Sequence, residues 1–455
     1  MNGYQSVEDQ CLRQCISAYE ASPYNRATER GLSDGVTQRD KRQFPPPPRI
    51  LHFIFIGDIH QDEFVRFTFT DYLMIRAAYF RLQPDEIYLH SNVPPLDSPH
   101  WDLIRPMISV QKHLEPITEI YGNVVTGKAH FSDVARLRVL QEYGGMYMDI
   151  DSICLRPFTK NMWDPPSGMT MGYESKERHH IGCGVIIARK DSMFMKRWLE
   201  SYKTFNDKQW ADHTVHMAGK LANEHPDEID VLPETHFYRP SWRPESIKLL
   251  WEERPADDIH LFNFSQAYAP HYWGTIARKA GRIDRMSAQT IVSENVGIHQ
   301  ILRPLLPNPY FSLAVHCSAS PDAYWKIQSS IDAIVNQSFP LWEILLVEDD
   351  HNDACSTYVL EHIVSKSRRL TAHLPKSIRT IRLDGHSIKS YAHGIWLIEL
   401  GVGQKFSASN SLEQAVNRFH EDSDKRVWHF DGEKQIEFIY DSSRGISRVP
   451  RPLRD

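Results

Sequence analysis

The stretch that decides the fold is EYGGMYMDID, at residues 142–151. Its two adjacent glycines end a predicted helix, and a short apolar strand with two carboxylates follows them. Because side chains alternate along a strand, Asp149 and Asp151 should share one face with Tyr147. We therefore expect both carboxylates at the end of a buried strand, which is where α/β sheets bind ligands.

The segment before the glycines predicts a helix over residues 132–143, with Ser132 as the cap at its start. Asp133 and Arg136 are three positions apart, so they lie on one face of this helix. One interpretation is an ordinary surface ion pair, which contributes little to stability. The other is a clamp for sugar hydroxyls and phosphate, because the helix leads directly into the acidic strand.

Strand and helix patterns alternate on both sides of this stretch. The apolar run RILHFIFIG at 49–57 predicts a buried strand, residues 63–82 a helix and residues 86–92 a second strand. This spacing is typical of an α/β unit with a right-handed crossover. Farther along, residues 184–188 predict another strand and residues 193–202 another helix.

Three regions are expected along the chain. Residues 1–44 form a polar N-terminal segment, and a first α/β domain covers 45–300. Prolines between 301 and 309 interrupt the pattern, so a smaller α/β domain and a basic tail are expected over 301–455. The predicted elements of this second domain are a strand at 311–315, a helix at 324–336 and a strand at 342–347.

Composition excludes several classes of protein. Of 455 residues, 52 are Lys or Arg and 58 are Asp or Glu, a net charge of −6 that argues against nucleic-acid binding. No apolar run approaches the ~18–20 residues of a membrane-spanning helix. The start of the chain lacks the apolar core of a secretory signal, so we expect a cytoplasmic protein, with peripheral membrane contact left open. The six cysteines are scattered and are expected to be reduced thiols.

The paired carboxylates indicate a particular chemistry. Asp149 and Asp151 can hold a hard divalent cation, Mn²⁺ or Mg²⁺, through their oxygens while substrate phosphates complete its shell. Such a cation neutralises a diphosphate leaving group, which is the main electrostatic demand in breaking a sugar–phosphate bond.

Three segments together resemble glycosyltransferase family 32, a group of sugar transferases with an Asp-x-Asp motif that is related to the glucosyltransferase domains of clostridial toxins. They are PPPPRILHFIFIG at 45–57, FSDVAR at 131–136 and EYGGMYMDID at 142–151, and the likeness covers residues 45–275. The resemblance implies a GT-A type fold, in which helices flank a Rossmann-like mixed sheet. It also implies a nucleotide-diphosphate sugar as donor, a Mn²⁺ or Mg²⁺ ion and retention of anomeric configuration.

Carried over by position, the resemblance gives roles to the first two segments. Phe55, Ile56 and Gly57 would line the nucleobase site. Asp133 and Arg136 would contact the donor sugar and count among the catalytic residues.

The same resemblance gives roles to the acidic strand and to a later segment. Tyr147 would pack against the nucleotide, Asp149 would bind the ribose or reach the metal through water, and Asp151 would ligate the metal. Asp149 and Asp151 complete the expected catalytic set. In the later segment YAPHYWG, at 268–274, His271 is the candidate metal or diphosphate ligand and Trp273 lies at the donor site.

The second domain has a fainter resemblance, over residues 310–400, to half of a glycosyltransferase family 2 domain. It departs from that pattern, with Glu348 where Asp is usual and Asp350 where Gly is usual. Residues 431–433 (Asp-Gly-Glu) are the only stand-in for a second metal motif. We expect a degenerate domain that docks on the first.

The sequence thus predicts a metal-dependent glycosyltransferase, a hexosyltransferase, that acts on a hydroxyl of a glycan, lipid or small molecule. Two alternatives stay open. A phosphatase of the haloacid dehalogenase type would use Asp149 as nucleophile and residues 348–350 as its distal acidic motif. The other alternative is an inactive sugar-nucleotide-binding partner of another transferase.

Overall fold

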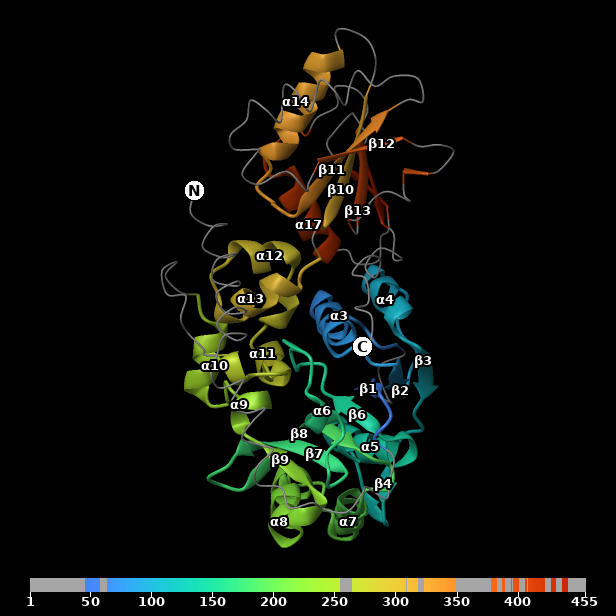
Figure 1. Cartoon of the computed structure of the whole chain (residues 1–455), viewed down its shortest axis with the longest axis vertical. Coiled ribbons are helices and arrows are strands. Elements are labelled where there is room, and N and C mark those ends of the chain that lie inside the picture. Colours follow the sequence, from blue (N-terminus) through green and yellow to red (C-terminus); the bar gives the residue numbers. More distant parts are fainter. Residues whose placement is uncertain are drawn as a thin grey trace.

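The computed structural model describes residues 46–57, 64–253, 264–307, 309–317, 323–348, 378–382, 387–388, 394, 396–400, 406, 408–421, 427–430 and 436–440. The expectations for residues 1–44, for Asp349 and Asp350, for the 431–433 motif and for the basic tail lie outside these residues. Two sheets lie toward opposite ends of the longest axis, and short helices lie between them (Figure 1).

The first sheet has seven strands in the order β3-β2-β1-β6-β8-β7-β9. β1, β2, β3 and β6 run parallel, β8 runs antiparallel to β6 and β7, and β9 runs parallel to β7. This is the expected mixed sheet flanked by helices, and the prediction of the fold class is confirmed. The strands are β1 (Ile50–Phe55), β2 (Glu86–Ser91), β3 (Val110–His113), β6 (Gly145–Met148), β7 (Met169–Ser175), β8 (His180–Ala188) and β9 (Asp230–Leu232).

Successive side chains of β6, the strand that precedes Asp149, pack on opposite faces of the sheet. Met146 and Met148 of β6 are buried in a core with α3 (Phe69–Leu82) and α4 (Pro99–Ile104). Tyr147 points to the opposite core, which α5 (Lys128–Tyr143) and α7 (Met193–Ser201) complete. Helices therefore cover both faces of the central strands, and that is why β1 and β6 are almost continuously apolar.

The short helices between the sheets extend the first core. They are α6 (Lys160–Trp163), α8 (Met217–Glu224), α9 (Glu234–Phe237), α10 (Pro244–Trp251), α11 (Gly274–Lys279), α12 (Ala288–Ser293) and α13 (Gly297–Leu302). Ile247 of α10, Ile298 of α13 and Phe311 of the second sheet belong to the same buried cluster as Leu51 of β1. A two-stranded hairpin, β4 (Glu119–Ile120) and β5 (Asn123–Val124), lies apart from both sheets.

The second sheet has the order β12-β11-β10-β13-β15-β14. Its elements are β10 (Phe311–His316), α14 (Ala323–Val335), β11 (Trp342–Glu348), β12 (Ile378–Arg382), β13 (Trp396–Leu400), α17 (Ser411–Glu421), β14 (Val427–Phe430) and β15 (Ile436–Tyr440). The strand, helix and strand expected near 311–347 are present, with parallel pairing of β10 and β11.

Three expectations need correction. The helix expected from residue 63 begins at Phe69, because Thr68 and Asp71 form a capping box there. The helix expected to start at Ser132 begins at Lys128, so Ser132 lies inside it. Cys317 is disulfide-bonded, so the expectation of reduced thiols is wrong for that residue.

Across the described ranges, every helix is too short or too polar to cross a lipid bilayer.

Candidate active site

The candidate site lies at the carboxyl ends of β1 and β6. These strands pair in parallel, with Leu51 beside Met146, so the ends of both strands open on the same edge of the sheet. The chain turns where β6 ends: the N–H of Asp149 donates to the carbonyl of Gly184 at 2.7 Å, and the N–H of Ser152 donates to the carbonyl of Asp149 at 3.0 Å. This turn, rather than a longer strand, brings both carboxylates of the motif to one place.

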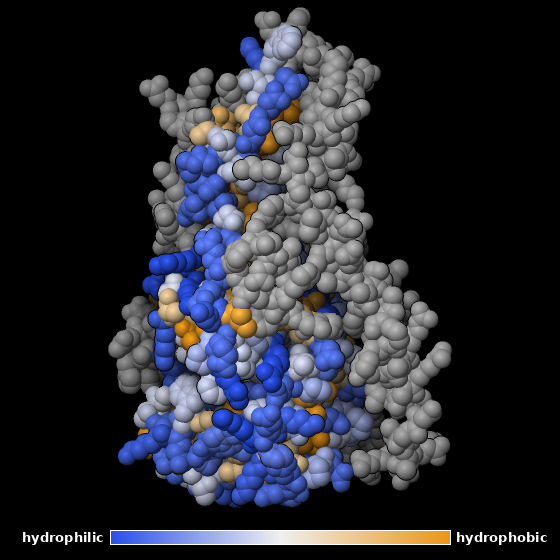
Figure 2. Space-filling view, turned by 90° about the vertical axis from the view of Figure 1, so that its left-hand side faces the viewer, coloured by the Kyte–Doolittle hydropathy of each residue, from blue (hydrophilic) through white to orange (hydrophobic). Residues whose placement is uncertain are grey.

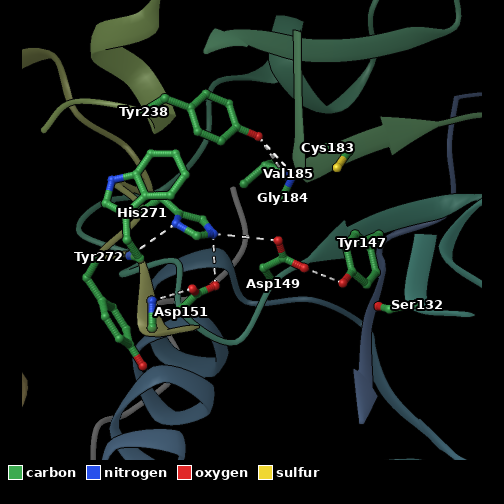
Figure 3. A network of polar contacts seen from close by, with 12 residues as sticks. Ser132, Tyr147, Asp149, Asp151, Cys183, Gly184, Val185, Tyr238, His271 and Tyr272 are labelled. Atoms are coloured by element: carbon green, nitrogen blue, oxygen red, sulfur yellow. Dashed lines mark hydrogen bonds and ion pairs between the residues drawn. The ribbon is translucent and has the colours of Figure 1, made fainter. Parts of the chain in front are cut away.

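Asp149, Asp151 and His271 converge at this edge (Figure 3). His271 Nε2 is 2.9 Å from Asp151 Oδ1 and 3.6 Å from Asp149 Oδ2. One donor atom from each residue lies within 4.8 Å of the other two, and no second group of this kind occurs among the described residues. Two carboxylates and one imidazole are donors that suit a divalent cation such as Mn²⁺.

The segment after His271 fixes these side chains. The N–H of Trp273 donates to His271 Nδ1 at 3.2 Å, and the N–H of Gly274 donates to Asp151 Oδ2 at 2.7 Å. The ring centroids of His271 and Trp273 are 4.5 Å apart. Burial disfavours the charged form of His271, but Asp151 and Asp149 outweigh it and raise its pKa to about 10. The two carboxylates therefore favour a positive charge at His271, and a metal ion bound there would have to replace its proton.

Arg136 is buried behind Asp149, with 6% of its surface exposed. Its Nη1 donates to the Cys183 carbonyl at 2.8 Å and lies 3.5 Å from Asp149 Oδ1. Its other nitrogens donate to the carbonyl and the hydroxyl of Ser132, at 3.2 and 3.1 Å. The guanidinium also lies 4.6 Å from the centre of the Tyr147 ring. Arg136 thus orients the acidic motif, and Ser132 is its partner rather than a helix cap.

Asp133 and Arg136 form the expected ion pair, with Oδ1 and Nη2 3.1 Å apart. Asp133 is only 9% exposed, so this is a buried pair and the surface interpretation is wrong. Burial raises the pKa of Asp133 to about 6 even though Arg136 opposes the rise. Burial would also raise the pKa of Asp149, but Arg136 and then His271 bring it down to about 2. Asp149 is therefore ionised and ready to bind a cation at neutral pH.

The predicted nucleobase segment lies at the end of β1. The Gly57 N–H donates to Asn92 Oδ1 at 2.9 Å, and Asn92 Nδ2 donates back to the Gly57 carbonyl at 3.2 Å. The Phe55 ring packs on Phe67, with centroids 4.6 Å apart. Contacts with Asn92 and Phe67 thus hold Gly57 and Phe55 in place. The segment follows the carboxyl end of β1, which pairs in parallel with β2 and with β6, the strand that leads to Asp149.

Residues of β8 and a loop aromatic support the site and were missed by sequence reasoning. A Cβ at Gly184 would lie 2.9 Å from Asp149 Oδ2 and 3.2 Å from His271 Cδ2, so only glycine leaves both side chains in place. The Tyr238 hydroxyl accepts the N–H groups of Gly184 and Val185 at 2.9 and 3.3 Å. The signal was available: Gly182 and Gly184 alternate in a strand, and such glycines mark a close approach.

The second domain does not contribute to this site within the residues described. Glu348 ends β11 and is buried in the second sheet, whereas Asp149 follows β6 of the first. The likeness to family 2 stays a prediction, since its remaining acidic positions lie outside the described residues.

Comparisons with known proteins identify the region that contains the motif. Residues 84–169 match the family described as the glycosyltransferase sugar-binding region containing DXD motif. They run from just before β2 to the first residue of β7 and include Asp149 and Asp151. The predicted resemblance to sugar transferases with an Asp-x-Asp motif is confirmed.

A curated relative is similar over half of the chain. Glucan organizing enzyme 1 of Cryptococcus neoformans var. grubii is 35% identical over 240 residues, which are 52% of this chain and 63% of the relative. The chain thus covers less than two thirds of that protein.

Two solved structures show weaker likeness. The PaToxG glycosyltransferase is 15% identical, with a TM-score of 0.29 over 48% of this chain and 80% of that one. Mannosyltransferase PcManGT of Pyrobaculum calidifontis, solved with GDP-Man and Mn²⁺, is 15% identical, with a TM-score of 0.19 over 27% of this chain and 36% of that one.

Proposed function

We propose, from the glycosyltransferase DXD region that the chain carries over residues 84–169, that this protein is a metal-dependent glycosyltransferase. It would move a sugar from a nucleotide-diphosphate sugar to an acceptor hydroxyl, with retention of configuration as the family resemblance implies. The observation that carries the proposal is the convergence of Asp149, Asp151 and His271 at the carboxyl edge of the sheet. We also propose a first domain over 45–300 and a second, degenerate domain over 301–455.

Asp149, Asp151 and His271 would hold the cation, Mn²⁺ or Mg²⁺, which supplies charge stabilisation to the departing diphosphate. The chain's own contribution is preorganisation. Gly274 and Trp273 donate N–H groups that hold Asp151 and His271 in place. A site that is fixed before the substrate arrives spends little energy on reorganisation during the reaction.

Arg136 would act on the donor through Asp149. Its guanidinium is directed at Asp133, Asp149 and the Cys183 carbonyl, so it holds the carboxylates at a set distance and keeps Asp149 ionised. Asp133 would contact a sugar hydroxyl, as the resemblance implies. Phe55, Ile56 and Gly57 would line the nucleobase site, with Trp273 beside the donor. The expected contact of Tyr147 with the nucleotide needs correction, because Tyr147 is only 1% exposed and packs in the core, where its hydroxyl donates to Asp149.

The name of the similar glucan organizing enzyme supports a glycan as the acceptor. The described residues do not favour the phosphatase alternative, because Glu348 ends a strand of the second sheet, whereas Asp149 follows a strand of the first. The inactive-partner alternative is decided by experiment.

The test is donor hydrolysis without an acceptor. The protein is incubated with Mn²⁺ and a panel of UDP- and GDP-sugars, and release of the nucleoside diphosphate is measured. Asp151→Asn should lower the rate by about 100-fold or more, because it removes a charged ligand. Asp191→Asn is the matched control, since Asp191 is exposed and lies just outside the strand β8.

Hydrolysis that continues unchanged in Asp151→Asn, or in the presence of a chelator, would refute the metal site. Nucleotide-sugar binding with neither hydrolysis nor transfer across the panel would favour the inactive partner.

A further inference from the structure

A separate cavity of about 340 Å³ lies between the β7–β8 turn and α8. We call it the basic pocket. α8 lies at the lower end of the molecule in Figure 1, and the lower end of the face in Figure 2 is mostly hydrophilic. Its lining residues are Arg178, His179, His180, His216, Lys220, Asn223 and Glu224.

Three uncommon backbone features meet at the basic pocket. His179 has a φ of 55°, in the left-handed region that residues other than glycine seldom adopt. Residues Asp212–His216 form a π-helix, a rare element that is frequent at functional sites. A Cβ at Gly219 would lie 1.6 Å from the His179 carbonyl oxygen, so α8 packs directly on the turn. Together they bring His179, His180 and His216 to one wall.

The side chains of the basic pocket offer hydrogen-bond donors from several directions. The rings of His180 and His216 have centroids 4.4 Å apart. Asp212 Oδ1 binds His216 Nδ1 at 3.0 Å, which leaves Nε2 as the nitrogen that can meet a ligand. Arg178 and Lys220 add two permanent charges, and the carboxylate in the pocket, Glu224, lies 3.9 Å from the Lys220 ammonium.

This chemistry favours an anion over a metal ion. The guanidinium of Arg178 and the ammonium of Lys220 would repel a cation, although Glu224 and Asp212 offset part of their charge. Among the described residues, the histidines and carboxylates here also do not form a group of three metal ligands. A phosphate monoester offers three oxygens that accept several charge-assisted hydrogen bonds, whereas a carboxylate offers two. Arginine and lysine are also the side chains that commonly bind phosphate.

β8 connects the basic pocket with the candidate metal centre. It begins at His180, which lines the pocket, and a Cβ at Gly184, four residues on, would lie 2.9 Å from Asp149 Oδ2. A molecule whose hydroxyl lies at the metal centre could therefore place a charged group in the pocket.

We propose that the basic pocket binds the phosphate group of the acceptor substrate. That the ligand is the acceptor rests on the proposed transferase function, whereas binding of phosphate in the pocket is independent of that function. The ligand would be a phosphomonoester, either on a soluble sugar or on a lipid headgroup.

The first experiment measures the pocket alone. Inorganic phosphate is titrated into the full chain by calorimetry, without metal or nucleotide sugar and at constant ionic strength. Wild type should bind one phosphate, and Lys220→Gln or Arg178→Gln should weaken binding about tenfold or more. Lys248→Gln is the matched control, because Lys248 is also an exposed helical lysine paired with a glutamate four residues on. Equal binding by all four proteins, or no binding, would overturn the proposal.

The second experiment tests the acceptor. Transfer is compared for a sugar 6-phosphate, the same sugar without phosphate, and vesicles that contain phosphatidylinositol 4-phosphate, whose headgroup carries both a phosphomonoester and free hydroxyls. Preference for one of the two phosphorylated acceptors, reduced in Lys220→Gln and kept in Lys248→Gln, supports the proposal and names the source. Equal transfer to the neutral sugar would overturn it. If no donor is used at all, the transferase function fails while the phosphate titration still decides the site.

Discussion

Acidification should destabilise this chain through two buried histidines beside the acidic strand. His52 of β1 has Nε2 at 2.8 Å from the Gly144 carbonyl and Nδ1 at 3.0 Å from His90 Nε2. A carbonyl can only accept, so His52 must be protonated at Nε2. Burial lowers the pKa of both rings, so both are neutral at neutral pH. In the neutral form His52 must accept at Nδ1, and His90 must donate to it.

The magnitude follows from the pKa values. Burial lowers the pKa of His52 to about 4, and burial and then His52 lower that of His90 to about 3. Unfolded histidine titrates near 6.5, so below that pH the unfolded chain binds more protons than the folded one. The stabilisation is complete above about pH 6.5 and is lost as the pH falls toward 4. At about pH 4.5 each histidine lowers the free energy of unfolding by about 2.5 kcal/mol relative to neutral pH, and the two together lower it by at most about 5 kcal/mol.

His90→Gln isolates one ring. The glutamine amide can donate to His52 from nearly the same position, but it cannot gain a proton. Urea unfolding followed by tryptophan fluorescence is measured at about pH 7 and about pH 4.5, and the variant should lose about 2 kcal/mol less than wild type between them. His113→Gln, an exposed histidine on β3, should lose as much as wild type. An acid loss in His90→Gln equal to that of wild type would refute the tautomer argument.

Three further predictions concern the site and the domain boundary. Arg136→Lys should lower the free energy of unfolding by about 2–4 kcal/mol, because one ammonium cannot satisfy all the buried acceptors around it; unfolding of Arg138→Lys, exposed on the same helix, should match wild type. A loss of turnover in Arg136→Lys with unchanged stability would instead show a direct contact with the donor. Gly184→Ala should reduce metal-dependent hydrolysis about 10–100-fold by displacing Asp149, with Gly127→Ala as the tolerated control. Truncation after Pro304 should give aggregation in size-exclusion chromatography, because the cut opens the shared core; a monomeric, active fragment would contradict this.

The sequence predicted most of the strands because they are buried on both faces. A short, continuous apolar run such as residues 50–55, closed by a glycine, is typical of a strand that is buried on both faces. The start of α5 was misplaced because its N-cap is Gly127, which has no side chain to cap the helix, while Ser132 binds Arg136. Helix caps are local signals, and tertiary contacts override them.

The site was predicted unevenly. Asp149 and Asp151 are two positions apart in the sequence and could be recognised there as an Asp-x-Asp motif. The burial of Asp133 and Arg136 could not, since it depends on β8 packing against β6, two strands far apart in the chain. His271 was a candidate only through the resemblance, because many histidines are present and only the fold places one 2.9 Å from Asp151.

The buried cluster that joins both sheets has a thermodynamic consequence. Phe69 of α3 meets Tyr310 just before β10, with ring centroids 6.4 Å apart, and Arg76 donates to the Leu305 carbonyl at 2.8 Å. Regions that share a continuous interior tend to open as one cooperative unit rather than separately. A ligand that binds only the folded state at β1 and β6 would therefore raise the free energy of opening of β10 and β11 as well. Amide hydrogen exchange in the second sheet should slow when only the first sheet is occupied, which makes the distant strands a reporter of donor binding.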